Sequence, residues 1–176
     1  MGAEWFNPVA RAAVEWCTRV LKPEHIRWLQ QLPYQIREED MLFCHGSPYR
    51  QEEFPYLFSP AQAREVFLHV PDLPPLTFVG HTHRPITFFS PLTSRTEIDV
   101  ITDDTFTVTP QNRYIINVGS VGQPRDGDWR ACYALFDSES RECRMVRVEY
   151  DVEQAYEKIR QAGLPRQLGE RLFYGM

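Results

Sequence analysis

Apolar and polar positions along the chain predict helices at its start, strands through its middle and a further helix near its end. Asn7-Pro8 supplies a helix cap followed by proline at the first helical position, and Ser59-Pro60 repeats the signal. Apolar side chains then recur at helical spacing, with Ile26, Leu29 and Trp28 expected to face inward in the second helix. The predicted helices span residues 8–20, 23–32, 60–70 and 152–162.

Short apolar runs bounded by turn residues predict the strands. They span residues 34–37, 41–44, 76–79, 86–89, 97–101, 105–109, 114–118, 131–136 and 143–149. The later connections are too short for helical crossovers, so the second half is expected to form a mostly antiparallel sheet. The element order predicts an α+β fold, and a chain of 176 residues is long enough for a single domain, residues 1–176, with its own core.

Composition excludes several functional classes. A net charge of -5, with Lys and Arg scattered along the chain, gives no nucleic-acid-binding face. No apolar run approaches a membrane span, and no signal segment opens the chain, so a cytoplasmic location is expected. Cys17, Cys44, Cys132 and Cys143 form no C-x-x-C pair and are expected to be free, buried thiols.

Two histidine motifs follow predicted strands. Gly80-His81-Thr82-His83 comes directly after the apolar run 76–79, and His45-Gly46 comes directly after 41–44. His81 and His83 would point the same way if the strand continued, and would fan out around one point if the chain turned after Gly80. Either arrangement brings neutral imidazoles together, which suits a transition-metal site at one edge of a sheet.

A third segment completes a resemblance. With His45-Gly46-Ser47-Pro48, the 80–85 segment Gly-His-Thr-His-Arg-Pro and the 117–128 segment beginning Asn-Val-Gly-Ser, the chain resembles the calcineurin-like metallophosphoesterases. The likeness is to the small bacterial and archaeal phosphodiesterase, or diadenosine-tetraphosphatase-like, branch. It implies a β-sandwich flanked by helices, of which this chain would be the C-terminal portion of the αββα fold.

The resemblance also implies ligand roles. His45 and His81 would bind the second metal of a two-metal centre, and His83 would bind the first. The ions would be divalent Mn, Fe, Zn or Ni, two in a complete family member. Three further family motifs, Asp-x-His, Gly-Asp and Gly-Asn-His-Asp, precede the histidine motifs in the family, and none of them occurs ahead of His45 here. Two close cations need a bridging carboxylate, so at most one ion is expected in this chain.

The missing motifs predict an N-terminal truncation. Met1 would then be an internal methionine of a longer protein, or the gene product would have lost its first half. Loss of the family's central strands would bare an apolar edge at 41–44 or 76–79, and such an edge invites pairing with a second copy or with the missing half.

Three functions compete. The first is a metal-dependent phosphoesterase that hydrolyses phosphodiesters or phosphomonoesters by a two-metal-activated water, with the isolated chain inactive. The second is a catalytically inactive remnant that acts as a binding or structural module. An unrelated zinc hydrolase is disfavoured, because no distant set of strand-end ligands is apparent.

Two loops lie beside these motifs in the sequence. Arg125, in the Gly-rich segment, is a candidate for contact with substrate phosphate; the alternative is that Asp126 or Asp128 holds its guanidinium. The aromatic loop Tyr49 to Phe58 could shape a pocket for a base or an apolar leaving group. Its alternative role is to cover the core or to meet the missing half.

Overall fold

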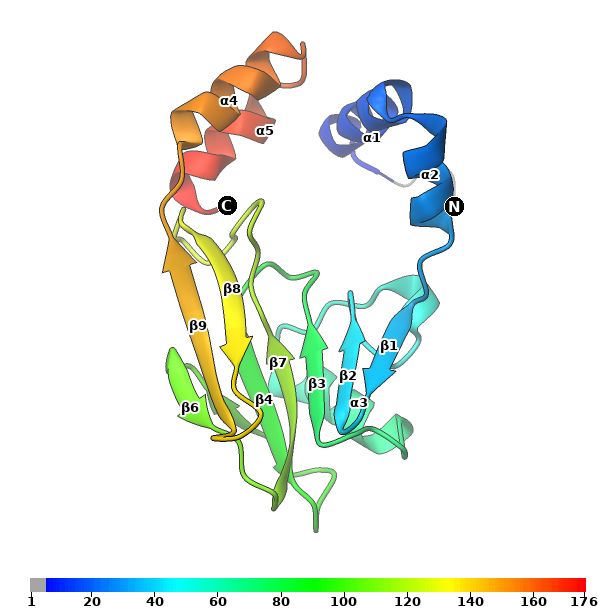
Figure 1. Cartoon of the computed structure of the whole chain (residues 1–176), viewed down its shortest axis with the longest axis vertical. Coiled ribbons are helices and arrows are strands. Elements are labelled where there is room, and N and C mark those ends of the chain that lie inside the picture. The colour runs from blue at the N-terminus through cyan, green and yellow to red at the C-terminus, as the bar shows by residue number, and fades with distance from the viewer. Residues whose placement is uncertain (1–5) are drawn as a thin grey trace.

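A computed structural model describes residues 6–176 as two β-sheets with helices on one face and at one end (Figure 1). One sheet has six strands in the order β1-β2-β3-β7-β4-β5, and the other has three in the order β6-β9-β8. The strands of the larger sheet are β1 Gln35–Glu38, β2 Met41–Cys44, β3 Leu76–Val79, β4 Ile86–Pro91, β5 Asp99–Ile101 and β7 Asn112–Asn117. The smaller sheet consists of β6 Thr105–Thr107, β8 Ala131–Phe136 and β9 Glu142–Val148.

The helices follow the predicted caps. They are α1 Pro8–Val20, α2 Pro23–Gln30, α3 Pro60–His69, α4 Val152–Gln161 and the short α5 Gln167–Glu170, with 3₁₀ turns η2 Gln51–Glu53 and η3 Arg171–Tyr174. Asn7 accepts the N–H of Ala10 at 2.9 Å. Ser59 and Gln62 form a reciprocal capping box at α3. These side chains satisfy amides that a helix start otherwise leaves without partners.

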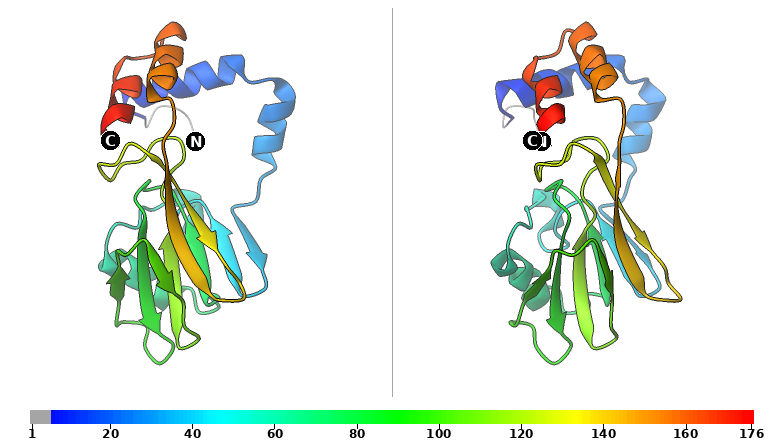
Figure 2. Two further views of the ribbon diagram at one scale, coloured as in Figure 1. Left: turned by 60° about the vertical axis from the view of Figure 1, so that its left-hand side comes forward. Right: turned by 90° about the vertical axis from the view of Figure 1, so that its left-hand side faces the viewer.

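Two cores hold the layers together, and Figure 2 shows the sheets side by side with α3 outside the larger one. The first core, between α3 and the larger sheet, includes Leu42, Val66 and Ile115. The second lies between the two sheets and includes Phe78, Ile116 and Cys143. The predicted α+β fold, with sheets flanked by helices, is thus confirmed.

The sheets are more mixed than expected, because β2, β3 and β7 run parallel to one another while the remaining pairs are antiparallel. The expectation of a bared edge at 41–44 or 76–79 is wrong. β2 is paired on both sides, by β1 and β3, and β3 lies between β2 and β7. The edges of the larger sheet are β1 and β5, at each of which unpaired backbone groups face outward.

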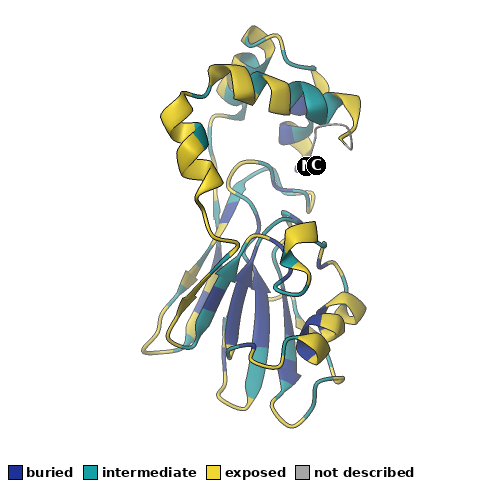
Figure 3. Cartoon of the chain, turned by 90° about the vertical axis from the view of Figure 1, so that its right-hand side faces the viewer, coloured by how far each residue is buried: buried dark blue, intermediate teal, exposed yellow. Residues whose placement is uncertain are grey.

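Helices α1 and α2 stand away from both cores, and neither has a buried residue (Figure 3). The prediction that Trp28 and Leu29 face inward is therefore wrong, since they are 61% and 48% exposed. Cys17 on α1 is also exposed, which corrects the expectation of four buried thiols, although all four cysteines are free. Among residues 6–176, no helix has the length and apolar character needed to cross a membrane.

Candidate metal site

Adjacent parallel strands bring the two histidine motifs together. β2 and β3 pair in parallel, so the residues that follow them, His45 and Gly80, emerge at the same edge of the sheet. The N–H of Gly80 donates to the carbonyl of His45 at 2.9 Å, which fixes the two turns against each other. This register explains why residues 35 positions apart in sequence meet at one point.

The imidazoles of His45 and His81 are in direct contact. Nε2 of His45 lies 3.0 Å from Nδ1 of His81, and the ring centroids are 4.9 Å apart. The chain turns after Gly80, and both His81 and His83 adopt left-handed backbone, with φ of 64° and 61°. Of the two arrangements that the sequence allowed, the structure has the fanned one. Left-handed backbone is costly for non-glycine residues, and such strain concentrates at functional sites.

Burial favours the neutral form of His81 and of His83. It lowers the pKa of His81 below its ordinary value, and the nearby His45 and His83 lower that pKa further. Burial also lowers the pKa of His83, against a hydrogen bond with the backbone of Gln123; Arg125, His45 and Arg171 lower it as well. A neutral imidazole has the free lone pair that a metal ion requires.

The ring of His83 has a defined orientation. Its Nδ1 lies 2.6 Å from the carbonyl oxygen of Gln123, which can only accept, so Nδ1 carries the proton. Nε2 of the neutral ring is then the nitrogen with the lone pair. Metal-binding histidines in proteins are commonly held in this way by a backbone carbonyl.

Asn117 fastens the turn 80–83 to the segment that follows β7. Its side chain is buried, and Nδ2 donates to the carbonyl of Gly80 at 2.7 Å and to Oγ1 of Thr82 at 2.8 Å. Its Oδ1 accepts the N–H of Gly119 at 3.1 Å. Asn117 begins the 117–128 segment that carries part of the family resemblance, and the sequence alone predicts no role for it. The signal that could have found it is a polar residue ending an otherwise apolar strand.

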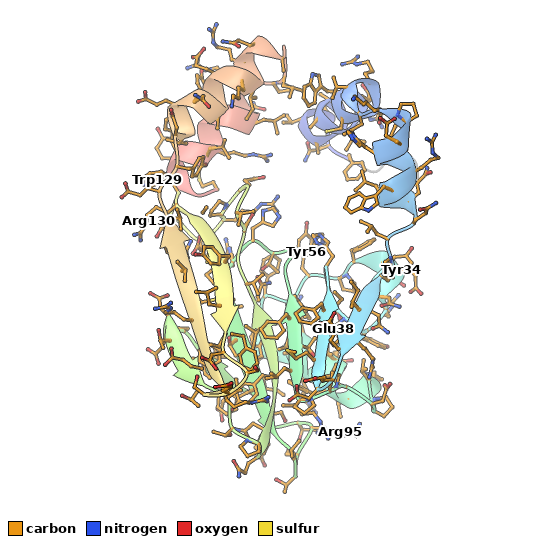
Figure 4. All side chains as sticks on the ribbon, in the orientation of Figure 1. Tyr34, Glu38, Tyr56, Arg95, Trp129 and Arg130 are labelled. Carbon is orange, nitrogen blue, oxygen red and sulfur yellow. The ribbon has the colours of Figure 1, made fainter. Side chains whose placement is uncertain are left out.

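An aromatic column stands beside His81. Tyr56 stacks on the His81 ring at 4.1 Å and Phe58 stacks on Tyr56 at 5.1 Å, while the Arg84 guanidinium lies 5.7 Å from the Phe58 centroid. Figure 4 labels Tyr56 at the end of the sheet where β2 and β3 finish. Tyr56 stacks on both His81 and Phe58, so these rings support the orientation of His81.

The donors fit part of a metal site. The 3.0 Å between His45 and His81 is near the roughly 3.3 Å between two nitrogens that each lie about 2.0–2.1 Å from one tetrahedral Zn²⁺. In the part of the chain that the structure describes, no group of three or more His, Cys, Asp or Glu side chains is arranged to hold a metal ion. The spacing of the pair is therefore compatible with two positions of one coordination sphere.

Arg125 lies in the same region, and its neighbouring carboxylates have other partners. Asp126 pairs with Arg147, and Asp128 pairs with Arg130 at 2.6 Å. Within residues 6–176 Arg125 forms no ion pair, and its Nη2 makes one long contact, 3.4 Å, with Oε1 of Gln123. The alternative that Asp126 or Asp128 holds Arg125 is not the arrangement in the structure.

Comparison with known proteins identifies the family of this chain. No protein-family model matches the sequence. The chain is 38% identical over 176 residues to the uncharacterized protein MJ0912 of Methanocaldococcus jannaschii, a match that covers 98% of this chain and 68% of that protein. About a third of that relative therefore has no counterpart in this chain.

Solved structures agree with the fold. The crystal structure of a metallophosphoesterase from Sphaerobacter thermophilus is 38% identical, with a TM-score of 0.79 over 100% of this chain and 71% of that one. The hypothetical protein PH1004 of Pyrococcus horikoshii OT3 shares the fold at 17% identity, with a TM-score of 0.73 over 98% of this chain and 62% of its own. The first likeness supports a hydrolase of phosphoesterase type, and this chain belongs to the calcineurin-like metallophosphoesterase superfamily.

Proposed function

We propose that the chain carries the histidine part of a metal-dependent phosphoesterase site, which acts on phosphodiesters or phosphomonoesters. The observation that carries the proposal is the contact between His45 and His81 at the ends of adjacent parallel strands, with His83 beside them. Family membership supports the involvement of divalent metal ions. When bound, such ions polarise the phosphoryl oxygens and activate water.

Each side chain has a separate part in this proposal. His45 and His81 offer nitrogens for one ion, and the carbonyl of Gln123 orients His83 so that its Nε2 faces away from that hydrogen bond. Arg125, which has no carboxylate partner in the described chain, binds phosphoryl oxygens of the substrate. Tyr56 stacks on His81 and fixes its ring.

The carboxylate ligands come from another polypeptide segment in this proposal. An apolar groove of about 860 Å³ runs beside His45 along α2, β1, β2 and β3. Ile36 and Phe43 line it, from paired positions on neighbouring strands. We propose that a segment carrying the family's Asp-x-His to Gly-Asn-His-Asp motifs covers the groove and completes the site. The alternative occupant, a second copy of this chain, would cover the groove only.

A hydrolysis assay tests the proposed function. The chain alone, with Mn²⁺, is expected to hydrolyse bis(p-nitrophenyl) phosphate little, because the described residues provide no carboxylate ligand set. Adding a polypeptide that carries the missing motifs should restore turnover, and the His81→Ala variant should not respond. The same addition to His69→Ala is the control, because His69 lies on α3, where it stacks on Tyr49.

The competing function is the inactive remnant that binds without catalysis. It predicts that the missing segment gives no gain in turnover, even when mixed at high concentration and shown to bind the chain. Full turnover by the chain alone would contradict both accounts, because it would require carboxylate ligands within this sequence that the structure does not bring together.

A further inference from the structure

The loop that carries Arg125 is fixed directly against His83. The N–H of Arg125 donates to the carbonyl of His83 at 3.0 Å, and the His83 ring donates to the carbonyl of Gln123 at 2.6 Å. Arg84 donates through Nε to the carbonyl of Arg125 at 2.6 Å. The Arg125 backbone therefore has a set position beside the histidines.

The last turn of the chain lies against the same loop. The N–H of Gly127 donates to the carbonyl of Gly175 at 3.1 Å, and Nε2 of Gln123 donates to the main-chain oxygen of Met176 at 2.7 Å. Gly175 is left-handed, with φ of 61°, and a Cβ there would lie 2.7 Å from the backbone of Asp128. These contacts fix η3, which begins at Arg171, over the loop.

Arg171 has one buried hydrogen-bond donor, Nε, for which the described residues provide no acceptor. Its Nε is buried and has no hydrogen-bond partner, and within residues 6–176 its guanidinium forms no ion pair. The nearest carboxylate in sequence, Glu170, pairs with Arg166 at 2.5 Å. A buried donor without a partner is costly, so Nε of Arg171 would gain from an acceptor that binds beside it.

Within residues 6–176, Arg125 and Arg171 influence each other and form no ion pair with a carboxylate. Burial lowers the pKa of Arg171, and the nearby Arg125 lowers it further. Both arginines also act on His83, whose pKa they lower. The carboxylates of the loop, Asp126 and Asp128, are engaged by Arg147 and Arg130. An anion between the two guanidinium groups would offset this repulsion.

We propose that Arg171 is a second substrate-binding arginine, which forms with Arg125 a two-guanidinium subsite for a phosphoryl group beside His83. The inference rests on the proposed function and adds a residue from the C-terminal turn to it. Guanidinium groups present paired N–H donors that match two oxygens of a phosphate, which suits a phosphoester with at least two free phosphoryl oxygens.

The probe for a test is inorganic phosphate, titrated into the chain at low ionic strength with EDTA present. Binding is followed by calorimetry and by NMR shifts. We expect Arg171→Met and Arg125→Met each to weaken phosphate binding by roughly tenfold or more, the effect of losing a charged hydrogen bond. Arg171→Lys, which keeps the charge but loses the fork, should bind with intermediate affinity.

The matched control is Arg160→Met. Arg160 lies on α4, in the same C-terminal group of helices, and pairs on the surface with Glu157 at 2.7 Å. Its replacement should leave phosphate affinity unchanged. Circular dichroism verifies that each variant is folded, and if Arg171→Met fails to fold, Arg171→Lys decides the question.

The inference is overturned if Arg171→Met or Arg171→Lys binds phosphate as tightly as the unmodified chain, or if the unmodified chain binds none. Because EDTA removes metal ions, the phosphate titration is read separately from the metal-dependent hydrolysis that tests the proposed function. If phosphate binding depends on Arg171 but the polypeptide that carries the missing motifs restores no turnover, only the catalytic proposal is refuted.

Discussion

Single residues carry most of what is unusual in this chain. His81 and His83 adopt left-handed backbone after a fully buried strand, and the buried amide of Asn117 fixes the turn between them. The sequence predicts the meeting of the histidines, because strand ends in parallel register share an edge. It does not predict the Asn117 hydrogen bonds, since a single polar residue gives no periodic signal.

Thiol chemistry gives a direct test of the structure at this scale. Burial raises the pKa of Cys44 to about 12 and that of Cys143 to about 11, and it also raises the pKa of Cys132, whereas Cys17 is exposed. A raised pKa keeps the thiol protonated and unreactive. We expect a disulfide reagent to modify Cys17 rapidly and the other three slowly, from pH 7 to pH 9.

The Cys17→Ser variant is the control and should lose the rapid phase of modification, while denaturant should expose all remaining thiols. Rapid reaction of a second thiol in the native chain would show that β2, β8 or β9 is less protected than the structure has it.

At the scale of elements, most helices and strands follow from pattern and caps. The interior runs 76–79 and 131–136 coincide with β3 and β8, and Ser59-Pro60 marks the start of α3 as predicted. The short segments α5 and η3, which carry Arg171, were not predicted, because four-residue elements show no periodicity. The orientation of α1 and α2 could not be predicted from the sequence either. An apolar stripe along a helix does not show which surface the helix packs against.

The junction between β7 and β8 gives the second test. Gly119 has φ of +77°, and a Cβ there would lie 2.7 Å from Sγ of Cys132, in the core between the sheets. Gly119→Ala should therefore lower the free energy of unfolding by about 2–4 kcal/mol, from backbone strain and overpacking. Urea denaturation measures the loss.

Gly122→Ala is its matched control, because a Cβ at Gly122 would meet nothing within 4 Å. Its free energy of unfolding should stay close to that of the unmodified chain. Equal stability of the two alanine variants would mean that the close approach of Gly119 to Cys132 is absent in solution.

At the scale of the whole molecule, the exposed surface points to association. The sequence led us to expect a bared strand edge, whereas the structure exposes an apolar face lined by Leu29, Leu32 and Ile36, which are 48%, 49% and 50% exposed. Contiguous apolar surface of this kind marks interaction sites. We expect the isolated chain to form a dimer or a larger assembly, as measured by light scattering.

Ile36→Lys on β1 should shift that assembly toward monomer. Val100→Lys is the control, because Val100 is 40% exposed on β5 at the opposite edge of the same sheet. A stable monomer for the unmodified chain would argue that the groove needs no cover.

The central claim is that His45 and His81 form two positions of a single metal site, and titration of Zn²⁺ into the apo chain tests it most directly. The account predicts at most one weakly bound ion per chain, lost in His81→Ala and kept in His69→Ala. Two tightly bound ions per chain, or binding that is indifferent to His81, would contradict it.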